Sequence, residues 1–258
     1  MESLLFIYFT YSCLDLGQRV ELSKILLGHK SPLPKILCAI ALVVTISACA
    51  RGPAPMDFVD PLTGPVSPAL AIPFDKYALT EAGLVRTHSE SGTENGIERP
   101  VIRTVSGSYL SRDFVFEVDV TIPADHGDIA YVGFGEAQPN LTLDNEPSHA
   151  FLFRIHNLPS MPFYGIDLAV GDPEGGVGYR GAFRYHERHA FYTPGKAMRF
   201  RITHRDGKVM LAIPALPDVH ATFDLAQFRD LFDSGHAYLF LSNSSVGTTF
   251  NNASLSAP

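Results

Sequence analysis

Arginine, histidine and aspartate recur at alternate positions of β-like segments in the second half of the chain. If Phe151, Phe153 and Ile155 face a core, Arg154 and His156 lie on the opposite face of their strand. The same alternation predicts three further members of this polar face: Asp167, Arg184 and His186. Arginine and histidine donate hydrogen bonds and a carboxylate accepts them. The combination indicates a ligand-binding sheet face, with an ordinary hydrated face as the alternative.

Other stretches contain residue types found in metal and nucleotide sites. The run His186-Glu187-Arg188-His189 is one residue short of the zinc motif H-E-x-x-H, and on a strand its two histidines point to opposite faces. Gly176–Gly181 spells G-x-G-x-x-G, but no βαβ unit surrounds it. No metal site and no catalytic residue are therefore assigned. Calcium is the alternative at four loop acids: Asp144, Glu146, Asp172 and Glu174.

A β-hairpin is the clearest element expected to position these side chains. In Met198–Thr203 apolar residues alternate with polar ones, and a second alternating run, Val209–Ile213, follows Asp206-Gly207. Alternating runs on either side of Asp-Gly predict a hairpin with a two-residue turn. Arg199 and Arg201 occupy polar positions of the first run, and we expect them near the polar face.

The chain has a β pattern from about Tyr77 to its end. Phe114–Ile122 alternates strictly, and shorter runs lie between loops rich in Gly, Pro, Asp and Asn. These runs are Gly83–His88, Ile97–Val105, Ile129–Gly135, His149–His156, Tyr164–Val170, Tyr179–Tyr185, His189–Tyr192, Ala237–Ser242 and Thr248–Ser256. One helix is expected, capped by Asp224, with apolar residues at Leu225, Phe228, Leu231 and Phe232. The predicted fold class is all-β, an antiparallel β-sandwich with one short helix.

An apolar stretch near the N-terminus indicates export. Lys35 precedes an uncharged run that ends in small residues and Cys49, which is the layout of a signal peptide. The run is shorter than the about 20 residues of a transmembrane helix. Its last residues, Ile46-Ser47-Ala48-Cys49, resemble the lipobox of bacterial lipoproteins. That resemblance implies that Cys49 is lipidated and anchors the protein to a membrane.

Composition agrees with an anchored, exported domain. The 209 residues after Cys49 contain no cysteine and hold 16 Lys and Arg against 24 Asp and Glu. This acidic balance argues against nucleic acid as a partner. Six prolines in residues 51–75 favour an extended spacer, although the later half is apolar enough to pack on a domain. We therefore expect a signal segment (1–49), a Pro-rich tether (50–76) and a sandwich domain (77–258).

The C-terminal third resembles the end of a concanavalin A-like jelly roll, the sandwich of lectins, glucanases and laminin-G-like domains. The residues that carry the resemblance are Met198–Ile213 and His236–Ala257. It implies two stacked antiparallel sheets, one of whose faces binds glycans in many members. Such sandwiches host lectins, hydrolases, lyases and inert spacers alike, so the likeness concerns the fold.

Catalysis on this fold should leave recognisable residues. One glucanase branch carries Glu-x-Asp-x-Glu or Glu-x-Asp-x-x-Glu on a strand, and retaining enzymes need two carboxylates about 5 Å apart. Glu117 and Asp119 match the first two acids, but Thr121 and Ile122 occupy both places for the third. The chain also has no tryptophan, the residue with the largest face for stacking on sugars. Both observations argue against a glycosidase. The missing tryptophan argues equally against a lectin, and it excludes neither.

Three functional interpretations remain open. The first, which the sequence favours narrowly over the third, is a non-catalytic envelope lipoprotein, in the outer membrane, whose sandwich binds a glycan such as a polysaccharide or another surface ligand. The second is a polysaccharide hydrolase or lyase with an unrecognised site. The third is a structural lipoprotein that binds envelope proteins.

Overall fold

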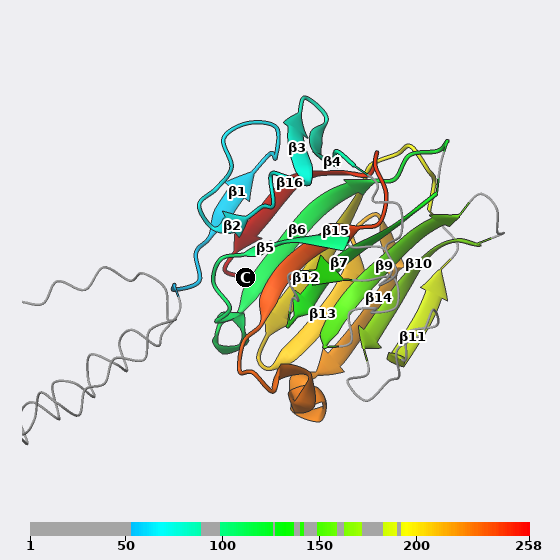
Figure 1. The fold of residues 1–258 in the computed structure, drawn as a ribbon. Coiled ribbons are helices and arrows are strands. Elements are labelled where there is room, and N and C mark those ends of the chain that lie inside the picture. Colours follow the sequence, from blue (N-terminus) through cyan, green and yellow to red (C-terminus); the bar gives the residue numbers. More distant parts are fainter. Residues whose placement is uncertain are drawn as a thin grey trace, which may run out of the picture. The chain divides into compact units, whose positions relative to one another are not determined.

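The structure is a computed structural model that describes residues 53–88, 99–125, 127–136, 140–141, 149–158, 163–171, 183–189 and 192–258. In this part of the chain two eight-stranded antiparallel sheets stack against each other (Figure 1). The apolar Ile36–Cys49 stretch and the G-x-G-x-x-G run lie outside the described residues. No helix among the described residues is long and apolar enough to span a membrane.

The first sheet has the strand order β14-β13-β12-β6-β16-β4-β3, and β1 also pairs with β16. In that order its strands are β14 (Leu216–Asp224), β13 (Lys208–Ile213), β12 (Met198–Arg205), β6 (Phe114–Thr121), β16 (Thr249–Ser256), β4 (Gly83–Arg86), β3 (Tyr77–Thr80) and β1 (Phe58–Asp60). Neighbours such as β12 and β6 are far apart in sequence, so long-range pairing holds the sheet together.

The second sheet has the order β11-β10-β9-β7-β15-β5-β2, with β8 also paired to β5. Its strands are β11 (Phe183–His189), β10 (Phe163–Gly171), β9 (Ala150–Leu158), β7 (Asp128–Gly135), β15 (Tyr238–Asn243), β5 (Arg99–Thr104), β2 (Leu70–Ala71) and β8 (Asn140–Leu141). Among the described strands, β11 pairs with β10 alone and is therefore an edge strand.

The core lies between the sheets because strand residues alternate between faces. In β6 every second residue, from Phe114 to Val120, is buried. Aromatic rings from opposite sheets meet edge to face: Phe153 and Phe200 have ring centroids 5.0 Å apart. The fold class predicted from the sequence is confirmed.

The predicted hairpin is also confirmed. The strands β12 and β13 pair from Arg205↔Lys208 onward. Asp206 and Gly207, between them, have φ angles of 50° and 71°. Positive φ at both central positions is what a tight two-residue turn requires, and Asp-Gly adopts it at low cost.

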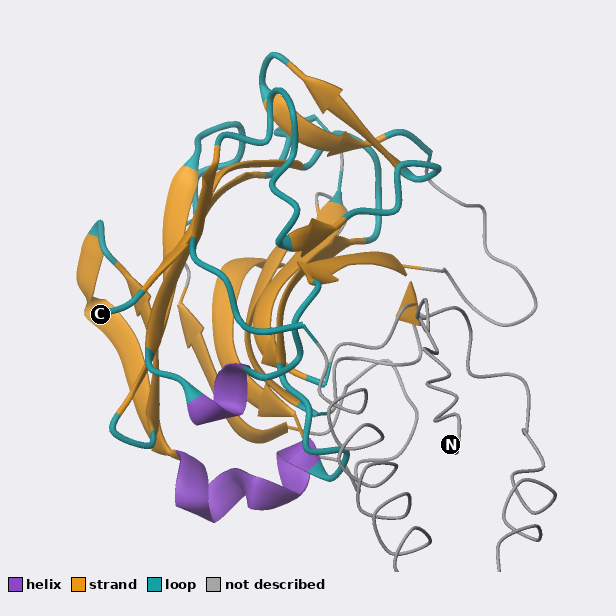
Figure 2. Ribbon diagram, turned by 90° about the vertical axis from the view of Figure 1, so that its left-hand side faces the viewer, coloured by secondary structure: helices purple, strands orange, loops and turns teal. Residues whose placement is uncertain are grey.

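The predicted helix forms as a 3-10 segment, η3 (Leu225–Phe232). The Asp224 carboxylate accepts a hydrogen bond of 2.9 Å from the backbone N–H of Ala226, which confirms the cap. Phe228 has non-helical dihedrals, φ −127° and ψ 29°, so the segment is kinked at this residue. Figure 2 shows η3 and the short η2 (Tyr109–Ser111) at one end of the sandwich.

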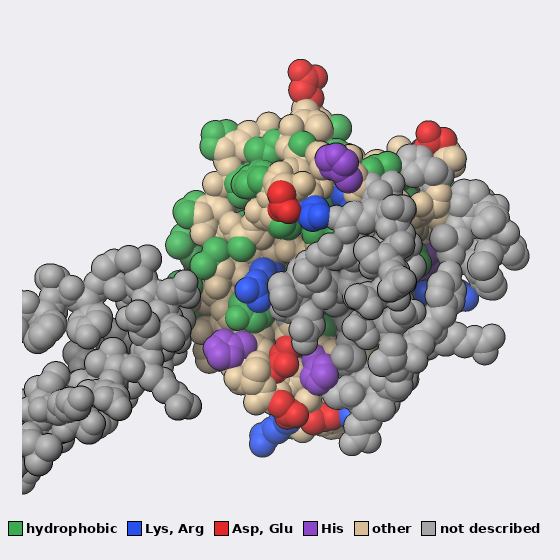
Figure 3. Space-filling model, viewed as in Figure 1, with side chains coloured by type: hydrophobic (Ala, Val, Ile, Leu, Met, Phe, Trp, Pro, Cys, Tyr) green, Lys and Arg blue, Asp and Glu red, His purple; other side chains and the backbone are tan. Residues whose placement is uncertain are grey.

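The Pro-rich segment was expected to be a tether whose later half packs on the domain, and in the structure its packing begins earlier. Its described residues, from Pro53, supply β1 and β2, one to each sheet. Phe58 and Leu62 are buried in the core, because apolar side chains in this segment find cover between the sheets. Exposed large hydrophobic side chains remain nearby, and Figure 3 shows hydrophobic atoms gathered on the side where β1, β2 and β5 lie.

Two strand assignments made from sequence need correction. The runs Tyr179–Tyr185 and His189–Tyr192 were expected to be separate strands, but β11 runs unbroken through the charged residues between them. As an edge strand, β11 tolerates charge on both faces. The strand β14 was missed because Pro217 interrupts its alternation, although Val219, Ala221 and Phe223 are buried.

The contact between Phe153 and Phe200 predicts a large effect on stability. We expect Phe200→Ala to lower the free energy of unfolding by about 3–5 kcal/mol, because it leaves a cavity between the sheets. Urea denaturation followed by circular dichroism measures this change. Val59→Ala, at a side chain 85% exposed, is the control and should change stability by less than about 0.5 kcal/mol. Equal effects of the two substitutions would contradict the assigned core.

Candidate functional site

A single carboxylate, Asp167, lies at the centre of the polar residues that the sequence singled out. In β10, Ile166 and Leu168 face the core, so Asp167 points away from the first sheet. The strand register places it opposite Arg154 of β9 on one side and Arg188 of β11 on the other. An Arg–Asp–Arg row thus crosses three adjacent strands.

Four side chains converge on this carboxylate. Arg188 donates from Nε to Oδ1 over 2.8 Å and from Nη2 to Oδ2 over 3.4 Å. The Nε2 atoms of His186 and His156 lie 3.1 Å and 3.4 Å from Oδ2, and Nη1 of Arg154 lies 4.0 Å from it. We call these five residues the Asp167 cluster.

The Asp167 cluster is layered by depth. Asp167 is fully buried and His156 almost so, whereas 37% of the His186 side chain and 42% of the Arg188 side chain are exposed. A ligand approaching from solvent therefore meets an imidazole and a guanidinium, held in place by a carboxylate beneath them. Donors positioned in this way lose little entropy when they bind a ligand.

Burial alone would raise the pKa of Asp167. Hydrogen bonds from His156, Arg188 and His186 outweigh burial and hold that pKa well below its usual range. The same contact with Asp167 raises the pKa of Arg188. The centre of the cluster is thus an ionised carboxylate with a charged guanidinium at neutral pH.

A glycine makes room for one of the histidines. Gly165 of β10 lies opposite His156 of β9. A Cβ atom at Gly165 would lie 3.3 Å from His156 Nε2 and 3.2 Å from the carbonyl oxygen of His189. Both distances are tighter than ordinary contact, so glycine at this position leaves room for the His156 ring.

Apolar and aromatic residues surround the Asp167 cluster on the outer face of the second sheet, the face turned away from the first sheet. A second apolar cluster lies here, formed by Val101, Ile129, Tyr131, Ala150, Leu152, Ala169 and Phe240. Phe183 packs against it and stacks on His186, with ring centroids 5.5 Å apart and planes 17° apart. An aromatic ring therefore adjoins the exposed donors of the site.

The structure brings together four of the five residues predicted for a ligand face: Arg154, His156, Asp167 and His186. The fifth, Arg184, forms an ion pair with Asp230 of η3 instead. The register of β11 against β10 shifts at Val170/Gly171, and Arg184 lies at that irregularity, between the residues that pair with Val170 and Gly171.

The sequence analysis missed Arg188, which makes the shortest contact with Asp167. Arg188 belongs to the run His186–His189 that was compared with a zinc motif. It fell in the gap between the two expected strands, Tyr179–Tyr185 and His189–Tyr192. The signal was present, because Arg188 lies two residues after His186 and hence on the same strand face. In the structure His189, the other histidine of that run, lies 3.2 Å from Glu187 instead.

Arg199 and Arg201, expected near this face, lie on the first sheet, where they pair with acids of β6. Arg199 donates to Asp119 over 2.7 Å and 2.9 Å, and Arg201 donates to Glu117 over 2.7 Å. Burial raises the pKa of Asp119, but hydrogen bonds from Arg199 and Asn252 outweigh it and lower that pKa. Both carboxylates are thus held as ion-pair partners.

Another buried carboxylate, Asp128, has a structural role at the start of β7. It accepts hydrogen bonds from Asn243 Nδ2 at 3.0 Å, from Ser244 Oγ and Ser245 N at 2.7 Å each, and from the hydroxyl of Thr248. Burial raises the pKa of Asp128, against these hydrogen bonds. The carboxylate is fully engaged in holding the β15–β16 loop.

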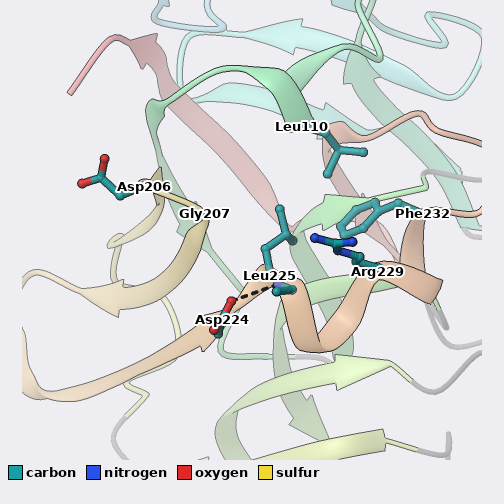
Figure 4. Close-up of a pocket in the computed structure, with 8 residues that line it drawn as sticks. Leu110, Asp206, Gly207, Asp224, Leu225, Arg229 and Phe232 are labelled. Atoms are coloured by element: carbon teal, nitrogen blue, oxygen red, sulfur yellow. Dashed lines mark hydrogen bonds between the residues drawn. The ribbon is translucent and has the colours of Figure 1, made fainter.

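A cavity of about 410 Å³ lies between η2, the β12–β13 turn and η3 (Figure 4). Its lining combines apolar Leu110, Leu225 and Phe232 with Arg229. None of the residues predicted for a ligand face lines it.

Metal ligands are a separate question for the described residues. Among the described residues, no group of three or more His, Cys, Asp or Glu side chains is placed to hold a metal ion. Asp167 does not fit a cation, because Arg188 occupies its oxygens. Asp144, Glu146, Asp172 and Glu174, the acids considered for calcium, lie outside the described residues.

Comparison with known proteins shows which fold the chain shares with solved structures. No protein-family profile and no curated protein sequence matches this chain. Among solved structures, the exoplasmic/lumenal domain of VIP36 in its Ca²⁺/Man2-bound form has a TM-score of 0.50 at 12% identity, over 77% of this chain and 86% of that one. CG-16, a homodimeric agglutinin from chicken liver, has a TM-score of 0.37 at 12% identity, over 61% and 99%. The likeness to VIP36 shows the concanavalin A-like jelly-roll fold.

The lowered pKa of Asp167 gives a pH-dependent prediction. Its ionised form stabilises the fold above the unfolded-state pKa of about 4, and this contribution is lost as pH falls through the lower folded-state pKa. We expect Asp167→Asn to cost about 3 kcal/mol at pH 7 and progressively less below about pH 4. Chemical denaturation of both proteins across this range measures the difference. A difference that stays constant with pH would contradict the assignment.

Proposed function

We propose that the protein binds carbohydrate, without transforming it, at the outer face of the second sheet. The observation that carries this proposal is the Asp167 cluster. It holds exposed imidazole and guanidinium donors over a buried carboxylate, beside the aromatic ring of Phe183. Sugars are bound by hydrogen bonds to their hydroxyl groups and by contact of their apolar face with aromatic rings.

The fold supports the same proposal. The solved structure of VIP36 with the same fold is described as bound to Ca²⁺ and Man2. Repeating the binding measurements with and without a chelator shows whether binding by this chain requires calcium.

A binding function is favoured over hydrolysis because of where the carboxylates lie. Glycosidases of the usual kind need two carboxyl groups flanking the scissile bond. On the described part of the outer face of the second sheet, Asp167 is the only carboxylate, and Arg188 binds both its oxygens. Glu117 and Asp119 lie on the other sheet, paired with arginines.

Protein binding is a second candidate, favoured by a different observation. In the part of the chain that the structure describes, four large hydrophobic side chains are exposed: Met56, Val59, Phe74 and Val105. They belong to β1 or to the segments next to β1, β2 and β5. Exposed apolar surface of this kind is typical of protein–protein contacts.

Substitution of His186 tests carbohydrate binding. We expect His186→Ala to weaken binding to the glycans recognised by the full-length chain by about tenfold, because it removes an exposed donor and the stacking partner of Phe183. A glycan array followed by calorimetry measures the affinity. His220→Ala, at an exposed histidine of β14, is the control and should bind normally.

Two results would contradict this proposal. One is that no polysaccharide binds the unmodified chain. The other is the appearance of new reducing ends or unsaturated sugars during incubation, which would identify a hydrolase or a lyase.

We further propose that Cys49 is lipidated and anchors the protein in the bacterial cell envelope, at the outer membrane. The support is the sequence Ile46-Ser47-Ala48-Cys49 after an apolar run. Stable anchoring takes more than one acyl chain, and lipoproteins of this kind carry several.

Replacement of this cysteine tests the anchor. Cells fed a labelled fatty acid should label the unmodified protein, and Cys49→Ala should lose the label and leave the membrane fraction. Cys38→Ala is the control, since it alters a cysteine inside the apolar run. Unchanged labelling of Cys49→Ala would overturn the proposed anchor.

A further inference from the structure

A group of exposed apolar side chains lies in the part of the domain that follows Cys49 most closely in sequence and in the strands next to it. Val59 is 85% exposed, Phe74 57%, Met56 47% and Val105 43%. We call these four residues the β1–β2 apolar surface, because they belong to or flank β1, β2 and β5, where Figure 3 shows hydrophobic atoms gathered. Single exposed apolar side chains need no explanation, whereas a group of them marks contact with another molecule or with a membrane.

Hydrogen bonds bring these side chains to one region although they are far apart in sequence. The backbone N–H of Val105 donates to the carbonyl oxygen of Ala69 over 2.8 Å, which places Val105 beside β2. The N–H of Met56 donates to the hydroxyl of Tyr109 over 3.4 Å, and Tyr109 follows Val105 by four residues. The Asp60 carboxylate accepts from two backbone N–H groups of the loop between β1 and β2, over 2.7 Å and 2.6 Å. The β1–β2 apolar surface is therefore a fixed part of the fold.

The chain between this surface and Cys49 is short. Met56 is the seventh residue after Cys49, and an extended chain spans at most about 3.6 Å per residue. If Cys49 carries the proposed lipid anchor, Met56 lies within about 25 Å of the anchored residue. The acyl chains would then keep this end of the domain close to the lipid.

The acidic residues nearest to this surface in sequence offer little opposition to contact with lipid. Asp57 forms an ion pair with Arg112, and Asp60 is only 1% exposed. Asp75 and Lys76, at the edge of the surface, carry opposite charges and can stay among hydrated head groups. The whole chain has a net charge of −7, so attraction to a membrane has to come from apolar side chains rather than from anionic lipid.

We propose that the β1–β2 apolar surface rests on the lipid bilayer, with Val59 and Phe74 inserted among the head groups. This inference rests on the proposed anchor at Cys49 and adds a second contact, which fixes the orientation of the domain. The strands β2 and β11 are at opposite ends of the second sheet (Figure 1). A domain docked through β1 and β2 therefore holds the Asp167 cluster away from the membrane, where a glycan can reach it.

Tryptophan fluorescence tests this docking, because the chain contains no tryptophan of its own. Val59→Trp and Phe74→Trp each introduce a single emitter into the full-length protein, which is purified from cells and reconstituted in vesicles of neutral phosphatidylcholine. We expect the emission of both variants to shift to shorter wavelength. It should also lose most of its intensity when the acyl chains of the lipid carry bromine, because the side chains reach the boundary between head groups and acyl chains.

Gln227→Trp, at an exposed position of η3, is the matched control. Its emission should be quenched by iodide in water and not by brominated lipid. Tryptophan itself favours membrane interfaces, so this control shows whether the position of the residue matters.

A charge placed on the surface should undo the docking. Val59→Asp, combined with Phe74→Trp, should return the emission to longer wavelength and restore most of its intensity in brominated vesicles. Thr222→Asp in the same background adds the same charge at an exposed position of β14 and should have no effect. Thermal unfolding of each variant shows whether it is folded.

The outcomes separate this inference from the proposed anchor. If the protein stays with the vesicles but the emission of Val59→Trp and Phe74→Trp matches that of Gln227→Trp, the docking is overturned and the anchor is not. The same result, together with crosslinking of position 59 to one envelope protein in cells, would assign the surface to a protein contact instead. A protein that does not stay with the vesicles at all would overturn both the anchor and the docking.

Discussion

Burial of an ionised carboxylate is the constraint on which the candidate site depends. Removing a charge from water costs several kcal/mol unless partners replace the lost hydration. Asp167 lies in the middle of β10, where strands on both sides exclude water, so the partners must come from β9 and β11. Arg188, His186, His156 and Arg154 meet this requirement, and their geometry follows from the strand register rather than from loops. A site built on strands in this way is more rigid than one built on loops.

The two sheets use the same residue types to different ends. On the first sheet Arg199 and Arg201 pair with Asp119 and Glu117, and Arg199 also lies 3.5 Å from Glu117. All four side chains are partly exposed. Surface pairs of this kind contribute little to stability and leave no net charge at the surface. On the second sheet one buried acid is shared among four cationic or imidazole side chains. Depth, more than residue type, therefore distinguishes the ion pairs of the first sheet from the candidate site of the second.

Alternation made most of the fold predictable from sequence. Strict alternation in Phe114–Ile122 and around Asp206-Gly207 predicted β6, β12 and β13, and it placed Arg154, His156 and Asp167 on the outer face. Alternation carries no information about which strands become neighbours. Arg199 was therefore expected near this site, although β12 pairs with β6 in the other sheet. Alternation of apolar and polar residues also fails to mark edge strands, because these tolerate charge on both faces. For this reason Arg188 was missed.

The charged residues of β11 could serve either ligand binding or protection of the sheet edge, and the structure distinguishes these two roles. Charged residues on an edge strand prevent pairing with other chains, which accounts for the exposed Glu187 and Arg188. Protection of an edge requires no buried acid on the neighbouring strand, because solvated charges serve it equally well. Asp167 is fully buried and binds Arg188 through both carboxylate oxygens, and Gly165 makes room for a second histidine beside it. Protection of the edge does not account for a buried carboxylate beneath exposed donors, whereas the proposed ligand binding requires such an arrangement.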